Sequence, residues 1–316
     1  MSAVVVLVGL IWVLLPAVLV WVVLLLTSRR ATDDGGDLAR AARRHENLMS
    51  WVALAAAAVC AVVLVVQPVV RPGWAPAPGT LQAMAPFSVA LVFCAVRAIG
   101  ERTWPRPAGE VRAAPLGRRT VRSAGGARLV GVLATAALLA VTLVVCGVTA
   151  DTSGRAYAAG PVALADGGVA TVAAGPYPGW PYGATMLLGL VLTVLATFAA
   201  LRCVVRRPPL PAVPALHDVA VRATGAARLL GAVQVCLGVA LAGTLFVAGS
   251  AVRSTGEDLA RTDTPEYADG ALLGSVGQAA IVAGLLVAVA SVVVGLLAWR
   301  ARAARGAVAP VRRVAA

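Results

Sequence analysis

The sequence predicts an all-α membrane protein, a bundle of seven transmembrane helices, and three observations indicate this. Hydrophobic residues make up 60% of the 316 residues, whereas charged residues make up only 13%. A soluble domain carries about a quarter charged residues, so a soluble enzyme is excluded, and so is a disordered chain. The mean hydropathy is +0.87, and apolar runs of at least 19 residues recur along the whole chain. Each run is long enough to span ~30 Å of hydrocarbon as a helix.

Seven apolar segments meet this length, and together they form a single transmembrane domain over residues 1–300. A basic tail, residues 301–316, follows them. The first segment is expected to stay in the protein as a helix, because its short leader has no arginine and its arginines follow the apolar run. The predicted helices lie near residues 3–26, 50–70, 81–99, 129–149, 183–201, 229–250 and 275–299.

The arginines predict how these helices are oriented. Alternate connections, with the C-terminal tail, carry 23 of the 27 arginines, and the remaining connections carry four. Arginine-rich connections stay on the cytoplasmic side, which predicts an outer N-terminus and a cytoplasmic C-terminus in the plasma membrane. The net charge of +13 is therefore explained by topology, and no nucleic acid is expected as a partner. Anionic membrane lipids at the cytoplasmic face are the partners that this charge predicts.

An internal repeat precedes two of the segments. The run Arg122-Ser-Ala-Gly-Gly-Ala-Arg128 leads into the fourth segment, and Arg222-Ala-Thr-Gly-Ala-Ala-Arg228 leads into the sixth, exactly 100 residues later. This offset predicts a tandem helical-hairpin repeat, helices 4–5 and 6–7, in which both copies have the same orientation. A third hairpin of segments two and three ends in a similar Ala-x-Arg sequence.

The longest outer connection, residues 150–182, predicts the only strands. Short apolar runs within 161–172 flank an Asp166-Gly167 pair. An Asp-Gly pair between such runs is typical of a tight β-turn, so a small β-hairpin is expected here.

Motifs for catalysis, cofactors or metals are missing from the sequence. The chain has no lysine, which excludes a retinal Schiff base despite the seven-helix pattern. Its two histidines, His45 and His217, lie in arginine-rich connections and are expected at the surface. Neither their spacing nor that of the cysteines matches a metal or redox motif. We therefore expect no catalytic residue, no cofactor and no metal, and a protein that is not an enzyme. The five cysteines are Cys60, Cys94, Cys146, Cys203 and Cys236.

Candidate contact residues are of two kinds. Arginines beside the fourth and sixth segments and in the preceding basic connection are expected at the inner leaflet, in contact with lipid headgroups or a partner. Gln234 is a candidate for a polar contact within the membrane, since an amide in a helix bundle usually bonds a neighbouring helix. No acid or base is expected well inside any segment. The candidate arginines are Arg112, Arg118, Arg119, Arg122, Arg128, Arg222 and Arg228.

Two stretches carry a resemblance to known sequences. The run Gly100-Glu-Arg-Thr-Trp-Pro-Arg-Pro107, with Arg118-Arg119 downstream, and the loop Pro176-Tyr-Pro-Gly-Trp-Pro-Tyr-Gly183 stand in the sequence. With these runs the chain resembles a family of uncharacterised multi-pass integral membrane proteins from high-GC actinobacteria. The resemblance implies a cell-membrane location and supplies no catalytic residue.

Three functions remain open at this point. The leading expectation is a non-enzymatic scaffold or accessory subunit with a protein partner or a second copy of itself, because no buried charge or catalytic motif is evident. The alternative is a transporter or exporter of a hydrophobic or lipid substrate, which needs no ion-coupling charge in the membrane. A third is an enzyme acting on lipid headgroups through interfacial acids such as Glu101 or Asp151.

Overall fold

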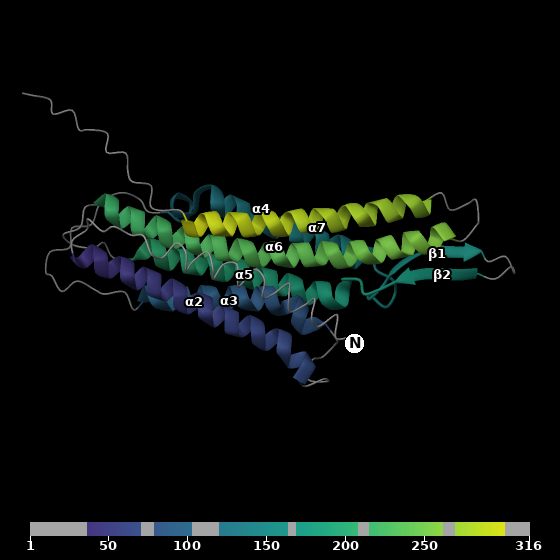
Figure 1. Cartoon of the computed structure of the whole chain (residues 1–316), viewed down its shortest axis with the longest axis horizontal. Helices are drawn as coiled ribbons and strands as arrows, with labels where there is room; N and C mark the ends of the chain where they lie inside the picture. Colours follow the sequence, from purple (N-terminus) through teal and green to yellow (C-terminus); the bar gives the residue numbers. More distant parts are fainter. Residues whose placement is uncertain are drawn as a thin grey trace, which may run out of the picture.

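The structure is a computed structural model that describes residues 37–70, 79–102, 120–163, 169–207, 215–261 and 269–300. The predicted first helix, near 3–26, and the tail 301–316 lie outside these residues. The described part forms six helices and a pair of strands, all drawn in Figure 1. They are α2 (Asp37–Val70), α3 (Thr80–Arg102), α4 (Val121–Thr149), β1 (Tyr157–Ala163), β2 (Val169–Ala174), α5 (Trp180–Arg206), α6 (Ala215–Arg261) and α7 (Asp269–Arg300).

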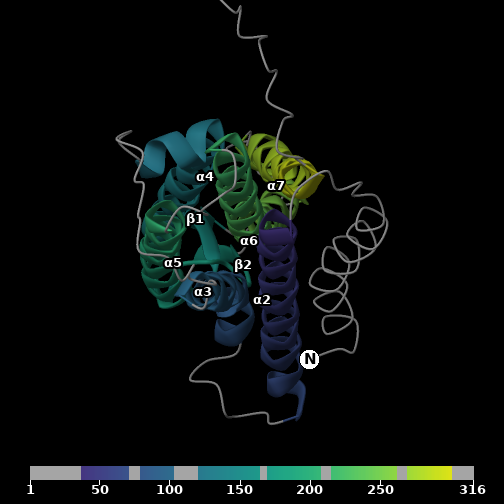
Figure 2. The same ribbon diagram turned by 90° about the vertical axis from the view of Figure 1, so that its left-hand side faces the viewer.

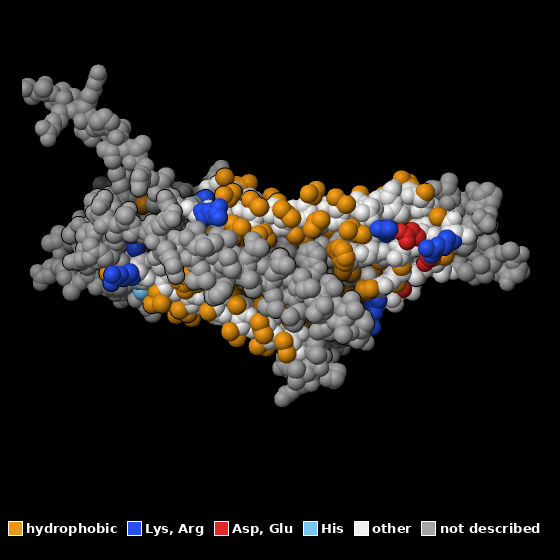
Figure 3. All heavy atoms as spheres, in the orientation of Figure 1, with side chains coloured by type: hydrophobic (Ala, Val, Ile, Leu, Met, Phe, Trp, Pro, Cys, Tyr) orange, Lys and Arg blue, Asp and Glu red, His pale blue; other side chains and the backbone are white. Residues whose placement is uncertain are grey.

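All six helices are long and apolar enough to cross a membrane. Successive helices run in opposite directions along one long axis, so the helix ends gather at two ends of the molecule (Figure 1). One end holds the start of α2 and the ends of α3 and α5, and we call it the arginine-rich end. The other holds both strands, and we call it the hairpin end. Where the face in Figure 3 shows described residues, apolar side chains predominate between the two ends, and the charged ones lie nearer the ends.

Two helices begin well before their predicted limits. Helix α2 begins at Asp37 rather than near residue 50, and α6 covers Ala215–Arg261 rather than 229–250. The prediction followed hydropathy alone and so ended each helix where charged residues begin. A helix continues into the polar region wherever its backbone bonds are satisfied and one face packs on neighbours. The extension of α2 places Glu46 inside a helix.

Helix α6 is the centre of the bundle. It contacts each of the other five described helices, which surround it in the end view of Figure 2. Its inward face is a row of buried leucines at helical spacing, including Leu230, Leu237 and Leu241. These side chains belong to the main core with Leu139 of α4 and Phe87 of α3. The apolar periodicity of α6 therefore determines the positions of its neighbours.

Helices α6 and α7 pack through glycines. A Cβ added at Gly256 or Gly277 would lie about 2.4–2.5 Å from a backbone nitrogen of the opposite helix. Small residues at such contacts let two backbones approach closely, which is the main source of helix association in a membrane. Helix α7 packs almost entirely on α6, and most of its remaining surface is apolar and exposed, as at Leu286 and Val289.

The fourth helix is interrupted near its start. Gly126 has φ 51° and ψ −142°, and these values lie outside the helical region. A positive φ is readily adopted only by glycine, so this residue permits the break. The residue 100 positions later, Ala226, is fully buried in an uninterrupted part of α6. The two copies of the predicted repeat therefore differ in backbone, and the pairing of α4 with α5 and of α6 with α7 does not establish a repeat.

The predicted β-hairpin is confirmed. Strands β1 and β2 pair antiparallel with Tyr157 opposite Ala174, and the pairing has one irregularity between Ala159 and Pro161. Both strands contact the hairpin end of α6, where the Thr255 hydroxyl donates a hydrogen bond to the Tyr157 carbonyl at 3.4 Å. The returning loop buries Tyr177, whose ring lies 5.6 Å from that of Tyr157.

Candidate functional site

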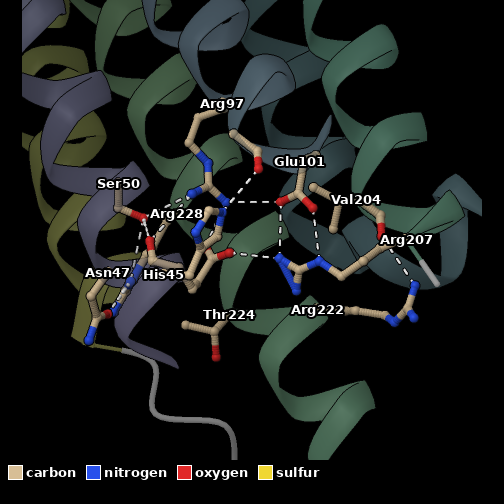
Figure 4. A network of polar contacts seen from close by, with 12 residues as sticks. His45, Asn47, Ser50, Arg97, Glu101, Val204, Arg207, Arg222, Thr224 and Arg228 are labelled. Carbon is tan, nitrogen blue, oxygen red and sulfur yellow. Dashed lines mark hydrogen bonds and ion pairs between the residues drawn. The ribbon is translucent and has the colours of Figure 1, made fainter. Parts of the chain in front are cut away.

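Four charged side chains form one ion-pair network at the arginine-rich end (Figure 4). Glu46 of α2 accepts hydrogen bonds from two guanidiniums, from Arg97 Nη2 at 2.5 Å and from Arg207 Nη2 at 2.9 Å. Arg207, directly after α5, binds Glu101 of α3 in a bidentate manner, through Nε at 2.8 Å and Nη2 at 3.1 Å. The network therefore joins α2, α3 and the end of α5 by charge-assisted bonds, which are the strongest hydrogen bonds in proteins.

These four side chains are almost completely buried. The exposed fraction is 1% for Arg97 and Arg207 and 4% for Glu46 and Glu101. The premise that no charge is buried is therefore wrong at this end. None of the four residues lies well inside a predicted segment, since all are near or beyond the segment ends. A buried charge is tolerated where an opposite charge and further hydrogen bonds compensate the loss of water, and every member here has such a partner. Arg97 and Glu101 lie one turn apart on α3, with Arg97 Nη2 3.6 Å from Glu101 Oε1. The other partners are 51 to 161 residues apart, so hydropathy within one segment gives no sign of them.

A serine and a glycine complete the surroundings of Arg97. Its Nη1 donates to the Ser50 hydroxyl oxygen at 3.1 Å, and the Ser50 hydroxyl donates to the Glu46 carbonyl at 2.8 Å. On the α6 side, a Cβ added at Gly225 would lie 3.0 Å from Glu46 Oε1 and 3.2 Å from Arg97 Nη2. The lack of a side chain at Gly225 thus lets α6 pack against the ion pair.

Two of the predicted contact arginines border the network instead of facing only the surface. Arg222 is buried, and its Nη1 donates to the carbonyls of Val204 and Val205 at 3.3 and 3.1 Å, near the end of α5. A cation is favoured there because the last carbonyls of a helix carry partial negative charge. Arg228 donates through Nη1 to Asn47 Oδ1 at 2.7 Å and to the Ser50 hydroxyl oxygen at 3.5 Å. The two arginines connect α6 to α5 and to α2.

Arg228 also reaches the last helix. Its guanidinium carbon lies 5.4 Å from the ring centroid of Trp299 on α7, a cation–π distance. Figure 4 shows Arg228 with Asn47 and Ser50 on one side of the network and Arg207 with Arg222 on the other. Through these contacts, side chains of α2, α3, α6 and α7 and the residue after α5 meet at the arginine-rich end.

The other predicted arginines are not brought to this site. Arg128, the counterpart of Arg228 in the repeat, is exposed on α4 and has no hydrogen bond or ion pair in the described part of the chain. Arg122 lies in α4, and its side chain is outside the described part. The remaining candidates, Arg112, Arg118 and Arg119, lie in a connection outside the described residues.

Gln234 lies in a packed contact among three helices. Its Nε2 donates to the Thr135 hydroxyl oxygen of α4 at 2.8 Å and lies 3.4 Å from the Ser291 hydroxyl oxygen of α7. The side chain is 8% exposed, and its Oε1 atom is buried without a hydrogen-bond partner in the described structure. Gln234 therefore links α6 to α4 and α7 by polar contacts.

An apolar groove of about 280 Å³ lies nearer the hairpin end, between α4, α6 and α7. Gln234 is not among the residues that line it. Tyr177 borders the groove, and its hydroxyl makes a 2.7 Å hydrogen bond with the Thr149 hydroxyl. Burial raises the pKa of Tyr177 above its ordinary value of 10, which keeps the phenol neutral at physiological pH. The groove therefore offers only neutral, mostly apolar groups, such as Val145, Leu245 and Val252.

The charged groups of the network bind one another and hold helix ends together. Arginine cannot act as an acid or base at ordinary pH, and both carboxylates are occupied by guanidinium groups. Among the described residues, no group of three or more metal-ligating side chains comes together. His45, also at this end, has its Nε2 3.1 Å from the Gly100 carbonyl oxygen, so it bonds the backbone of α3. All five cysteines are free.

The network was not predicted from the sequence, because the charged residues were used only to predict which connections are cytoplasmic. Two signals were available. Glu46 and Glu101 are the acids nearest the ends of two apolar segments, and Gly225 stands between Arg222 and Arg228. An acid beside an apolar segment in an arginine-rich region is a candidate for an ion pair between helices.

Comparison with known proteins adds no relative. The chain has no significant match among protein family models, curated proteins or solved structures. The class of the protein therefore follows from the fold, with six apolar helices of membrane-spanning length around a central helix, and this is a multi-pass membrane protein.

Proposed function

We propose that the protein is a non-enzymatic integral membrane protein that acts as a scaffold or accessory subunit. The observation that carries this proposal is that the buried charges bind one another across helices. A carboxylate that activates a substrate needs a free face, whereas Glu46 and Glu101 each bond guanidinium groups. Such a network stabilises one arrangement of helix ends, as a docking platform requires.

The hairpin end offers the surface for a partner. Helix α6 has 47 residues, so it is about 70 Å long and exceeds the ~30 Å hydrocarbon thickness. Its last turns carry the exposed ion pairs Arg253–Glu257 and Arg261–Asp258, beside the strands that pack on it. A rigid polar surface held away from the bilayer is suited to binding another protein.

Purification from native membranes in mild detergent, followed by native mass spectrometry, tests this function. A scaffold predicts a protein partner in fixed stoichiometry, lost when Arg261→Glu and Asp258→Arg disturb the exposed surface. The same partner should remain with Arg128→Gln, which changes an exposed arginine at the opposite end. Retention of the partner by the surface variant, or transport by the purified protein alone in vesicles, would contradict the proposal.

A second candidate function is export of a hydrophobic or lipid substrate, and the groove between α4, α6 and α7 favours it. A groove of about 280 Å³ lined by apolar side chains can hold part of an acyl chain. Movement of a fluorescent lipid across vesicles containing only this protein would support export. A Val276→Trp variant, which adds bulk at an exposed position that lines the groove, should then abolish that movement.

We also propose a topology of seven crossings in the plasma membrane, with the segment near 3–26 as the first helix. The arginine-rich end would be cytoplasmic, and the helix pairs α4–α5 and α6–α7 would be copies of one hairpin. The arginine distribution and the adjacent antiparallel pairs support this. Single cysteines at Ser254 and Arg102, in a variant without native cysteines, test it in intact cells. An impermeant maleimide should label position 254 and not position 102.

A further inference from the structure

We propose that Arg228, Asn47 and Trp299 form a binding site for the phosphate of an anionic lipid, between α2, α6 and α7. The shared chemistry is that of a phosphate monoanion or diester, and the position of the site favours the lipid as its source. The inference does not depend on the proposed scaffold role.

Positive charge exceeds negative charge among the buried side chains at the arginine-rich end. Both carboxylates of the network are bound to Arg97 and Arg207. Arg222 is directed to helix-end carbonyls. Arg228 donates hydrogen bonds only to the neutral oxygens of Asn47 and Ser50 and lies over the ring of Trp299. The Glu46 carboxylate, already bound by Arg97 and Arg207, attracts Arg228 only from beyond ion-pair distance. One guanidinium therefore lies beside the network without an anion of its own in the described part of the chain.

Arg228 and Asn47 each keep a hydrogen-bond donor that no described residue uses. Arg228 Nε is buried and has no hydrogen-bond partner in the described structure. Asn47 uses its amide oxygen to accept from Arg228, which leaves its NH₂ group as a donor on an exposed side chain. A phosphate oxygen accepts from just such guanidinium and amide groups. The site therefore provides positive charge and a second donor side by side.

The site lies at the level where lipid headgroups are expected. Trp299 is the penultimate residue of α7, and a tryptophan near a helix end is typical of the headgroup level. Leu48 and Leu297, both 56% exposed, are close in sequence to Asn47 and Trp299 and can contact acyl chains. Two exposed arginines, Arg44 on α2 and Arg300 on α7, add positive charge at the same end. Lipid phosphate, with its chains attached, fits this combination better than free phosphate.

The test uses the full-length protein, purified and stripped of lipid in detergent. Native mass spectrometry measures binding of dioleoyl phosphatidylglycerol, with dioleoyl phosphatidylcholine as the zwitterionic comparison. We expect phosphatidylglycerol to bind more tightly, and Arg228→Gln to weaken it by about tenfold, a typical value for losing one charged contact. Arg128→Gln, the matched change at the exposed repeat position, should alter the affinity by less than about twofold.

Two further measurements test the site without changing Arg228. Asn47→Ala alters an exposed side chain without changing charge, and it should weaken phosphatidylglycerol binding by about fivefold even if Arg228→Gln unfolds. Brominated phosphatidylglycerol should quench fluorescence that Trp299→Phe removes. The proposal is overturned if Asn47→Ala binds as the wild type does, or if the two lipids bind equally. Displacement of the lipid by inorganic phosphate alone would identify a free-phosphate site and overturn the lipid assignment.

Discussion

The two ends of the bundle differ in the burial of their ion pairs. At the arginine-rich end the side chains of Glu46 and Arg97 are paired at 4% and 1% exposure. At the hairpin end Arg253 and Glu257 form a pair of similar length, 2.6 Å, at 48% and 45% exposure. The groups buried at the hairpin end, such as Tyr177 and Thr255, are neutral. The same ion-pair chemistry therefore holds helices together at one end and serves a polar surface at the other.

The largest expected effect is the loss of one buried carboxylate. Glu46→Gln keeps the shape of the side chain but leaves Arg97 and Arg207 short of a negative charge. Removing one partner of a buried ion pair costs about 3–5 kcal/mol, and thermal unfolding in detergent measures it. Glu257→Gln at the hairpin end is the control, and an exposed pair should cost about 1 kcal/mol or less. Equal losses in the two variants would remove the distinction between the ends.

A double substitution sharpens the comparison. Glu46→Leu with Arg97→Met removes both members of one pair and leaves Arg207 bound to Glu101 through two bonds. Apolar replacements of a whole buried pair are often close to neutral, since the cost of removing the charges from water also disappears. We expect the double variant to be at least ~1 kcal/mol more stable than the less stable single variant in the same thermal assay. If the losses of the two single variants add in the double variant, packing and not charge pairing accounts for the stability that these side chains contribute.

Much of the fold could be predicted from the sequence, because hydropathy and arginine distribution are local signals. All six described helices contain the whole of their predicted segments, and the two strands lie on either side of the Asp-Gly pair. For α2 and α6 the prediction located the apolar part but not the polar extension. Those extensions depend on packing between helices, which a single segment does not report.

The buried network could not be predicted in the same way. Arg97 and Arg207 have the same local pattern as Arg128, an arginine beside an apolar run, yet two are buried and one is exposed. The difference comes from acids on other helices, Glu46 and Glu101. Likewise Arg122–Arg128 and Arg222–Arg228 read as copies, but Gly126 permits a break where Ala226 continues the helix. Burial is decided by neighbours in space, and only the structure provides them.

A smaller effect is expected from the neutral hydrogen bond at the hairpin end. The Thr149 hydroxyl donates to the Val145 carbonyl at 2.8 Å, so the Tyr177 hydroxyl is the donor in its 2.7 Å bond with Thr149. Tyr177→Phe removes that bond, and such a loss costs about 1 kcal/mol in thermal unfolding. Tyr182→Phe, in the first turn of α5, gives the comparison with the loss of a nearby phenol hydroxyl.

Alkaline pH distinguishes the wild type from Tyr177→Phe. Burial raises the pKa of Tyr177 in the folded protein, so the unfolded chain releases this proton first. Tyr177 therefore contributes a constant amount to the free energy of unfolding below its ordinary pKa of 10. The free energy of unfolding falls as the pH rises above 10. Thermal unfolding between pH 8 and about 11 should therefore show a steeper decline for the wild type than for Tyr177→Phe. Parallel curves would place the phenol in water.

The smallest expected effect concerns an exposed carboxylate at the hairpin end. Asp151 Oδ1 accepts hydrogen bonds from the backbone amides of Ala156 and Arg155, both at 3.1 Å, and from the Ser153 hydroxyl at 2.9 Å. The amide of Ala156 makes the largest contribution to lowering the pKa of Asp151 below its ordinary value of 3.8, and Ser153 and Arg155 contribute further. Because this pKa is lowered, the hydrogen bonds of Asp151 stabilise the turn fully above pH 3.8. The stabilisation is lost as the pH falls through the pKa that Asp151 has in the folded protein.

Amide hydrogen exchange of residues 151–157 measures this effect, because it reports local opening that global unfolding does not. Protection in the wild type should decrease between pH 6 and about 3 after correction for intrinsic exchange rates, whereas Asp151→Asn should lack this dependence. Asp258→Asn, which changes an exposed acid on α6 away from the turn, should leave the dependence unchanged. Turn protection that falls equally in Asp151→Asn would assign the pH dependence to another acid. With Glu46 buried at one end and Asp151 exposed at the other, a carboxylate in this bundle then contributes to stability according to its burial and its partners.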